Sequence, residues 1–448
     1  MKSNLIDYIK RIPPDREFLV TNTKKYSFGD ITKLYYEIKE KYPQLEGKNC
    51  AVISSDRESL AILIPGLDAI SSSLFLQAPD IEQATAEIFY QSANIQFVIK
   101  LLQGAIKSVD KQTFTCCEKS QRENHDDFLL ATSGTSGVPK LASYTLSSLM
   151  STAKSDVNKG SLFTWGLCYD INRFAGLQVY LQTIASGSKL VLCEPQDTIN
   201  HVVDVFYKNK VNCMSATPSF WRKVLMVPEH NLIPLKQITL GGEISTQNVL
   251  NALLKSYQNA KITHIYASTE AGVGFAVKDK MEGFPSEYLE KKSFTGYQLK
   301  VDNGILWVKS EHGCTRFLSG TIDIDKNGFL NTGDLVKIEG QRVYFLGRDS
   351  GTINVGGNKV MPEKIEAVLE KSDFVSMAKV SSKKNPILGA IVSAEIVLKK
   401  SVSHLSNKDI KKEIINFCRD KLESFEIPAI IKFVDQIEIN TTGKKIRN

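Results

Sequence analysis

The run from Thr132 to Lys140, TSGTSGVPK, has the composition of a loop that could hold phosphate groups. Gly134 and Gly137 permit backbone conformations in which N–H groups approach a ligand closely. The side chains that could donate to an oxyanion are Thr132, Ser133, Thr135, Ser136 and Lys140. The order GxxxxGK[ST] of the common nucleotide P-loop is absent. Taken alone, the segment is equally compatible with an ordinary solvated loop.

Further polar segments follow this loop along the chain. They are GGE (Gly241–Glu243), YASTE (Tyr266–Glu270), TGD (Thr332–Asp334), GRDSGTINVGGNKVMPEKIE (Gly347–Glu366) and NTTGKKIR (Asn440–Arg447). Each alone is more often a turn, a strand exit or a solvated side chain. In this order and at these distances, however, the set resembles the adenylate-forming enzyme superfamily. That superfamily includes acyl- and aryl-CoA ligases, adenylation domains of peptide synthetases, and luciferases. The resemblance covers nearly the whole chain.

The resemblance implies an ATP site and assigns a role to each segment. The loop would hold the β- and γ-phosphates, Tyr266 would stack on adenine, and Asp334 and Arg348 would bind the ribose. The remaining nucleotide-binding positions are Gly241, Gly242, Glu243, Ala267, Ser268 and Thr269. Ala267 and Leu141 replace glycines that are common in the family, which puts the shape of the pocket in doubt rather than its activity.

The implied chemistry explains why charged residues are needed. A carboxylate must attack the α-phosphorus of ATP, and both reactants are anions, so catalysis depends on charge neutralisation and positioning. By resemblance, Lys444 bridges the substrate carboxylate and the α-phosphate, Thr269 contacts that phosphate, and Glu270 ligates Mg²⁺. A cation at position 444 matters most as charge builds in the transition state.

A second half-reaction requires a thiol. In the family, the small C-terminal domain swings about a hinge that corresponds to Ser350. Lys444 then leaves the site, and the face around Gly356 and Gly357 comes in beside the pantetheine arm. That arm belongs either to coenzyme A or to an acyl carrier protein, and the mildly basic C-terminal region suits both.

The acid pocket is less well marked than the ATP site. By resemblance it includes Arg173, Phe174, Gly176, Ser215, Ala216, Thr217 and Pro218. Counting back from Gly187, Phe174 falls where amino-acid-activating relatives place the Asp that pairs with the α-ammonium group. An apolar ring cannot pair with that cation, so we predict a small carboxylic acid without a free α-amine. Arg173 either reads a polar or anionic group of the acid or extends along the surface.

The elements that must position these residues follow an α/β pattern. Between Cys50 and Lys100, short apolar strands alternate with helical segments, which predicts βα units and a largely parallel sheet. The rhythm returns at 190–192, 200–208, 211–216 and 238–240, and hairpins are expected after Phe294. We predict a large N-terminal domain of layered α/β subdomains (1–348) and a small, mobile α+β C-terminal domain (349–448), the latter with helices at 362–371 and 407–422.

Composition narrows the class of protein further. The chain has 448 residues and a net charge of +7, and residues 351–448 hold 17 basic against 12 acidic residues. With no Arg-rich arm, this favours a polyanionic small molecule or an acidic partner over nucleic acid. The eight cysteines form no CxxC pair, and neither a signal peptide nor a transmembrane segment is evident. We therefore expect a cytoplasmic protein without structural zinc.

Three functions remain open at this point. The first is an acid–CoA ligase that uses ATP and Mg²⁺ and proceeds through an acyl- or aryl-adenylate. The second is a stand-alone ligase that loads an acyl carrier protein. The third is a catalytically silent protein that only binds a nucleotide, which the presence of both Glu270 and Lys444 disfavours.

Overall fold

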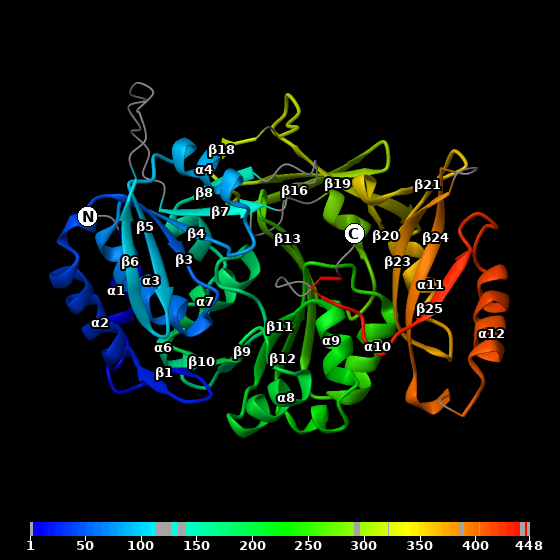
Figure 1. Ribbon diagram of the computed structural model, residues 1–448, viewed down its shortest axis with the longest axis horizontal. Coiled ribbons are helices and arrows are strands. Elements are labelled where there is room, and N and C mark those ends of the chain that lie inside the picture. The colour runs from blue at the N-terminus through cyan, green and yellow to red at the C-terminus, as the bar shows by residue number, and fades with distance from the viewer. Residues whose placement is uncertain are drawn as a thin grey trace.

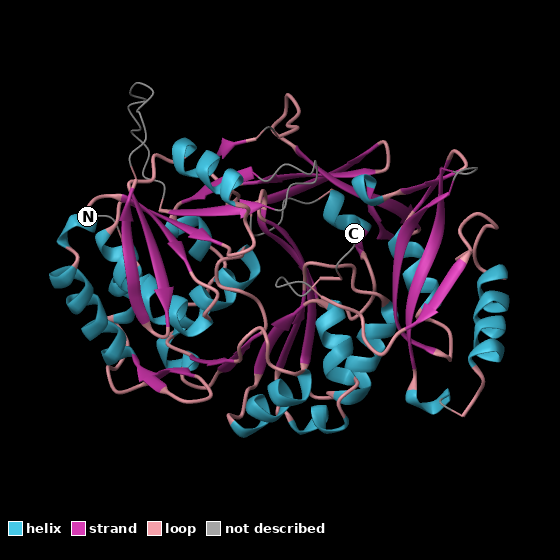
Figure 2. Ribbon diagram, viewed as in Figure 1, coloured by secondary structure: helices cyan, strands magenta, loops and turns pink. Residues whose placement is uncertain are grey.

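The structure is a computed structural model that describes residues 3–112, 127–132, 140–290, 296–320, 322–385, 389–402, 404–439 and 444–445. Figure 1 shows the chain passing from an N-terminal part at one end, through a central part, to a C-terminal part at the other end. Strands form the interior of each part, and helices cover them (Figure 2). The α/β class predicted from the sequence is confirmed, with a large N-terminal region and a smaller C-terminal one.

The first sheet has seven strands in the order β18-β8-β7-β4-β3-β5-β6. Their bounds are β3 (Asn49–Ile53), β4 (Ser73–Gln77), β5 (Phe97–Leu102), β6 (Ala105–Lys111), β7 (Phe128–Thr132), β8 (Lys140–Tyr144) and β18 (Arg316–Ser319). β5, β3, β4 and β7 are parallel, as the alternation between Cys50 and Lys100 predicts. Every residue of β4 and β7 is buried, because parallel strands have both faces covered.

The helices of this first part include those that the sequence predicts between Cys50 and Lys100, and others that it did not predict. They are α1 (Leu5–Ile9), α2 (Phe28–Lys41), α3 (Arg57–Ile70), α4 (Gln83–Ser92), α5 (Leu146–Met150) and α6 (Val157–Gly160), with a 3₁₀ turn η1 (Pro43–Leu45). α3 is buried along nearly its whole length. It lies so close to α2 that a Cβ on Gly66 would come within 2.8 Å of the Ile38 side chain, so a larger residue at position 66 would force the two helices apart.

The second sheet has eight strands in the order β14-β13-β12-β11-β9-β10-β1-β2. Their bounds are β1 (Glu17–Val20), β2 (Lys25–Ser27), β9 (Thr164–Leu167), β10 (Lys189–Leu192), β11 (Cys213–Ala216), β12 (Gln237–Leu240), β13 (Lys261–Ser268) and β14 (Gly272–Val277). The inner strands are parallel, and β2 and β14 are antiparallel edges. The associated helices are α7 (Phe174–Ser186), α8 (Ile199–Lys208), α9 (Pro218–Leu225), η2 (Pro228–Leu232) and α10 (Gln247–Ser256).

A third, antiparallel sheet follows and contains the predicted hairpins. Its order is β15-β20-β19-β17-β16, with β15 (Phe284–Pro285), β16 (Tyr297–Asp302), β17 (Ile305–Ser310), β19 (Leu330–Glu339) and β20 (Arg342–Arg348), and η3 (Ser286–Leu289) beside it. Its apolar cluster includes residues of β14, so this sheet packs against the edge of the eight-stranded sheet.

The C-terminal part has a hydrophobic cluster of its own, whose buried members run from Ile353 to Ile431. Its elements are η4 (Asp349–Gly351), β21 (Ile353–Val355), β22 (Asn358–Val360), α11 (Pro362–Leu369), β23 (Val375–Asn385), β24 (Gly389–Leu398), η5 (Lys400–Val402), α12 (Asn407–Arg419) and β25 (Ile430–Phe433). After β25 the chain turns back toward the central part (Figure 1). A separate core agrees with a separate C-terminal domain, although the boundary at 348/349 stays a prediction.

Within the described residues, no helix combines the length and the apolar character that a membrane span requires.

Candidate active site

The two ends of the phosphate-loop segment lie side by side. Thr132 ends β7 and Lys140 begins β8, and the two residues are paired across the antiparallel ladder. The predicted donors and glycines between them, Ser133, Gly134, Thr135, Ser136 and Gly137, lie outside the described residues. Thr132 is buried at 4% exposure. The role of this segment in holding phosphates stays a prediction.

The predicted ribose-binding residues form one hydrogen-bonded group. Asp334 on β19 lies directly opposite Arg348 at the end of β20. The Arg348 Nε donates to Asp334 Oδ1 at 3.0 Å, and the Tyr266 hydroxyl donates to Asp334 Oδ2 at 2.6 Å. Burial acts to lower the pKa of Arg348, but Asp334, Tyr266 and Glu270 together outweigh burial, so the pKa is raised overall. The structure therefore holds a charged guanidinium and a carboxylate together at the end of these strands.

The Tyr266 ring belongs to an aromatic row. It lies nearly parallel to the rings of Phe275 and Phe345, each with its centroid 5.4 Å away. Burial is the main reason that the pKa of Tyr266 is raised well above its usual range, so its hydroxyl stays a hydrogen-bond donor to Asp334. Stacking of Tyr266 on adenine remains a prediction.

Glu270 follows β13 and is held by its backbone rather than by its side chain. The Cys314 N–H donates to the Glu270 carbonyl at 3.2 Å, and the Tyr144 hydroxyl donates to the carbonyl of Thr269. Among the described residues, none bonds the Glu270 carboxylate, and no group of three or more metal-ligating side chains forms. Magnesium is usually held by one or two carboxylates together with substrate phosphates, so a single available carboxylate fits an ion that arrives with ATP.

The GGE segment lies between α9 and the C-terminal tail. Gly242 has a φ of +80°, and a Cβ added there would lie 3.4 Å from the Lys444 Cε and 3.6 Å from the Thr217 side chain. Glu243 accepts from the Ser219 N–H at 2.9 Å and from the Lys445 N–H at 3.2 Å. Glu243 was predicted as a nucleotide-binding residue, and the structure adds a contact to the tail that the sequence does not reveal.

The C-terminal tail brings Lys444 to the other predicted residues. Burial and the nearby Arg348 lower the pKa of Lys444, against the opposing charges of Glu243, Asp334 and Glu270. These side chains come from separate segments that are up to 201 positions apart in sequence, as the positions of Glu243 and Lys444 show. The arrangement places the Lys444 ammonium among the side chains that were predicted to bind ATP.

The acid-side residues occupy the start of α7 and the passage from β11 to α9. Phe174 is 9% exposed and packs on the Tyr144 ring, with centroids 5.8 Å apart. Ser215 and Ala216 end β11, Thr217 is the N-cap of α9, and Pro218 is its first residue; all are buried. A Cβ on Gly176 would meet the Asp170 carbonyl oxygen at 2.0 Å. Gly176 is thus required for the close packing of α7, whatever else it contacts.

Arg173 has a carboxylate partner that the sequence did not indicate. Its Nη2 lies 2.5 and 2.6 Å from the two carboxylate oxygens of Asp80. Asp80 itself is half exposed, with a side-chain exposure of 55%. An anionic group of a substrate would have to share or replace this partner, so substrate contact by Arg173 stays a prediction.

The residues assigned to the second half-reaction lie in the first elements of the C-terminal part. Ser350 is in η4, and Gly356 and Gly357 form the turn between β21 and β22 with φ values of +57° and +90°. Figure 1 shows β21 in the C-terminal part, and a Cβ added at Gly357 would meet no other atom of the described residues within 4 Å, so the turn is not packed against the site. In this orientation the tail lysine is in the site and the glycine turn is not. The hinge role of Ser350 remains a prediction.

Several residues at the site were missed by the sequence analysis. They are Asp80, Tyr144, Tyr169, Ser219, Arg222 and Lys445. Tyr144 closes the strand that Lys140 begins, and Ser219 and Lys445 directly follow the predicted Pro218 and Lys444, so position along the chain was an available signal for these three. Asp80, Tyr169 and Arg222 contact the site through pairings between distant segments.

Comparison with known proteins agrees with this geometry. The model of the family "AMP-binding enzyme" matches residues 41–303, and that of the "AMP-binding enzyme C-terminal domain" matches residues 364–444. The chain belongs to the AMP-binding enzyme family. As a member of this family it is related to a 2-succinylbenzoate–CoA ligase of Bacillus velezensis, at 24% identity over 98% of this chain and 95% of the relative. It is also related to a D-alanine–D-alanyl carrier protein ligase of Staphylococcus aureus, at 23% identity over 78% of each chain.

Solved structures of the family share the fold of this chain. ATP-bound MatB from Rhodopseudomonas palustris superposes with a TM-score of 0.76 at 17% identity, covering 99% of this chain and 97% of that one. The o-succinylbenzoate CoA synthetase MenE from Bacillus subtilis, in complex with its acyl-adenylate intermediate, gives a TM-score of 0.71 at 18% identity and the same coverage. At these identities the likeness shows the fold.

Proposed function

We propose that this AMP-binding enzyme is an ATP-dependent acid–thiol ligase that forms a CoA thioester through an acyl- or aryl-adenylate. The observation that carries the proposal is the convergence of Lys444 with Asp334, Arg348 and Glu270 beside Gly242. A 2-succinylbenzoate–CoA ligase that matches over almost its full length supports the choice of coenzyme A as the acceptor.

In the first half-reaction, an oxygen of the substrate carboxylate attacks the α-phosphorus, and pyrophosphate leaves. Asp334 and Arg348 hold the ribose, and the loop between Thr132 and Lys140 holds the departing phosphates. Lys444 neutralises the charge that develops between the carboxylate and the α-phosphate, which is where a fixed cation lowers the barrier most. Glu270 and the phosphates would hold Mg²⁺, and the ion would supply further charge neutralisation when bound.

In the second half-reaction, the thiol attacks the adenylate carbonyl, a thioester forms and AMP leaves. Lys444 has then completed its role, and the turn of Gly356 and Gly357 replaces it at the site. The small backbone of that turn lets a pantetheine arm lie close. The acid is one without a free α-amine, because Phe174 offers no charge to pair with an ammonium group.

A ligase for an acyl carrier protein is the second candidate. The relative that loads D-alanine onto a carrier protein favours it, and the excess of basic residues in 351–448 suits an acidic carrier surface. The two candidates share the first half-reaction and differ only in what presents the thiol.

Thioester formation tests both candidates in parallel. The wild-type protein is given ATP, Mg²⁺, a panel of acids with and without an α-amine, and either coenzyme A or a phosphopantetheinylated carrier protein. We expect a CoA thioester from an acid that lacks the α-amine, lost in Lys444→Ala and retained in Lys408→Ala, a matched change of an exposed lysine on α12. A thioester on the carrier alone would replace the first candidate by the second, and no thioester with either acceptor would overturn both.

A further inference from the structure

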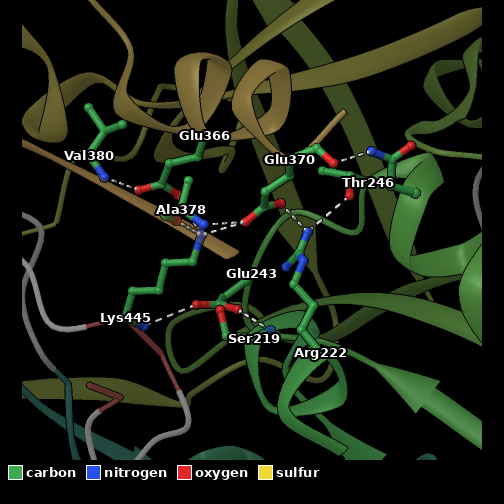
Figure 3. A network of polar contacts seen from close by, with 10 residues as sticks. Ser219, Arg222, Glu243, Thr246, Glu366, Glu370, Ala378, Val380 and Lys445 are labelled. Atoms are coloured by element: carbon green, nitrogen blue, oxygen red, sulfur yellow. Dashed lines mark hydrogen bonds and ion pairs between the residues drawn. The ribbon is translucent and has the colours of Figure 1, made fainter. Parts of the chain in front are cut away.

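The side chain of Lys445 is buried in the C-terminal part of the molecule. Its Nζ donates to Glu366 Oε2 at 2.9 Å, to Glu370 Oε1 at 3.2 Å and to the Ala378 carbonyl at 2.6 Å (Figure 3). The side-chain exposures are 7% for Lys445, 6% for Glu366 and 5% for Glu370. All three donor positions of the ammonium are thus satisfied in one place.

The backbone of Lys445 reaches in the other direction, to the large N-terminal region. Its N–H donates to Glu243 Oε1 at 3.2 Å, and the second oxygen of Glu243 accepts from the Ser219 N–H at 2.9 Å. One residue of the tail therefore joins α11 and β23 on one side to the start of α9 on the other (Figure 3).

A second ion pair crosses the same boundary. The Arg222 Nη2 on α9 lies 2.7 Å from Glu370 Oε2 and donates to the Thr246 hydroxyl at 3.0 Å. The Asn248 side chain on α10 donates to the Glu370 carbonyl at 3.1 Å. Glu370 therefore binds Lys445 with one carboxylate oxygen and Arg222 with the other.

The charges in this cluster compensate one another. Two cations, Lys445 and Arg222, face the buried carboxylates of Glu366 and Glu370. Burial acts to lower the pKa of Lys445, but the two carboxylates outweigh it and raise the pKa above its usual range. Removing one charge from such a group leaves the other uncompensated in a low-dielectric setting, so the cluster favours the orientation in which every member is paired.

Lys445 immediately follows Lys444, and consecutive Cα atoms lie about 3.8 Å apart. Because Lys445 is held by both its side chain and its backbone, the position of the neighbouring Lys444 Cα is restricted. The Lys444 Cε then lies 3.4 Å from where a Cβ on Gly242 would stand. A shift of about 1 Å in a positioned catalytic group can cost on the order of 100-fold in rate.

We propose that Lys445 is a positioning residue and that Lys445, Glu366, Glu370 and Arg222 form a two-domain latch. The latch holds the C-terminal part where Lys444 faces the nucleotide, and it opens before the thiol can be acylated. The catalytic part of this proposal rests on the proposed ligase function. The existence of the latch does not.

The two half-reactions are measured separately in Lys445→Met, which keeps the stem and removes the ammonium. We expect acid-dependent ATP–pyrophosphate exchange to fall on the order of 100-fold in kcat. Transfer from the prepared acyl-adenylate to coenzyme A should be unchanged or faster, because the latch is already open. Lys445→Arg, which keeps the charge, should restore exchange to within about tenfold of wild type. Lys408→Met serves as the matched control and should change neither rate.

Hydrogen exchange of the ligand-free protein tests the latch without any substrate. In Lys445→Met we expect faster exchange of the amides that the cluster orders, those of Ser219, Ala378, Val380 and residue 445. Lys444→Ala should leave these amides as protected as in wild type, because it removes the reacting cation and keeps the latch.

The double variant Lys445→Met/Glu366→Gln distinguishes loss of the latch from a folding defect. It removes the charge of Glu366 together with its lysine partner, so no uncompensated charge is left buried at position 366. Selective loss of the first half-reaction in this variant supports the proposal. Equal loss of both half-reactions, or no change in either, overturns the positioning role. Unchanged exchange of the four amides overturns the latch. If no acid supports pyrophosphate exchange in wild type, the ligase function fails, and the amide measurement still decides the latch.

Discussion

The nucleotide side of the site and the acid side are built differently. On the nucleotide side, Tyr266, Asp334 and Arg348 contact one another through hydrogen bonds of 2.6 and 3.0 Å. On the acid side, Phe174 is fixed by packing on Tyr144. A position that must donate or accept a particular hydrogen bond accepts few residue types. A packed apolar position accepts any side chain of about the right volume. This difference explains why motifs in the sequence point to an ATP site but do not identify the acid substrate.

Asp334→Ala should disrupt the hydrogen-bonded group on the nucleotide side and have the largest effect on activity. It removes the acceptor shared by Tyr266 and Arg348 together with the proposed ribose contacts. We expect kcat/KM for ATP to fall on the order of 100-fold, since two hydrogen bonds to a charged group are lost. The effect should be the same for every accepted acid, measured by pyrophosphate exchange. Asp302→Ala, at an exposed strand end, is the control. An effect that varies with the acid would show that the two sides are not separate.

The pH dependence of the first half-reaction should report on Lys444. Its pKa is lowered from the ordinary 10.5 by burial and by Arg348, so the ammonium is lost as pH rises through this lowered value. We expect kcat/KM for ATP to fall about tenfold per pH unit above it. Lys444→Arg stays charged throughout and should lack this alkaline limb. An identical limb in Lys444→Arg would assign the titration to another group.

Phe174→Ala should change the acid side alone. Removing the ring enlarges the predicted pocket, so the ratio of kcat/KM for a bulkier over a smaller acid should rise about tenfold, the usual value of a few buried carbons. KM for ATP should stay within about twofold of wild type. A changed KM for ATP with no change in acid preference would remove Phe174 from the acid pocket.

Arg173→Gln should have the smallest effect on activity, because the Arg173 guanidinium is already paired with the Asp80 carboxylate. For an acid with a second anionic group, we expect KM to rise about fivefold, as for a partly shared ion pair. Acids without that group should be unaffected. Asp80→Asn provides the opposite test, since it releases Arg173 and should lower KM for the same dianionic acids. No change in either variant would assign Arg173 to structure only.

The regular part of the fold could be predicted from the sequence, and the sequence also named Tyr266, Asp334 and Arg348, which the structure brings together. The central residues of β3 (50–52) and β4 (74–76) are apolar and buried, which is typical of parallel strands with both faces covered. α12 was expected to continue to Leu422, but it ends at Arg419. Helix ends depend on local capping, which is less well marked than apolar periodicity.

Contacts between distant segments could not be predicted. Arg173 and Asp80 are 93 positions apart, and nothing in either segment indicates the other. Lys445 and Glu366 are 79 positions apart, and in the sequence Lys445 is only the second lysine of a pair. Burial explains the partners of Lys445, because an ammonium in a low-dielectric surrounding must be paired with carboxylates, whereas an exposed ammonium need not be. The sequence shows which residues carry charge, and the tertiary structure determines which charges meet.

The proposed mechanism requires Lys444 to act on the substrate carboxylate and on ATP together. ATP–[³²P]pyrophosphate exchange across a panel of acids is the measurement that decides this role. We predict exchange that requires an acid, is abolished in Lys444→Ala and persists in Lys408→Ala. Exchange with no acid at all, exchange that survives in Lys444→Ala, or no exchange with any acid would contradict this role for Lys444.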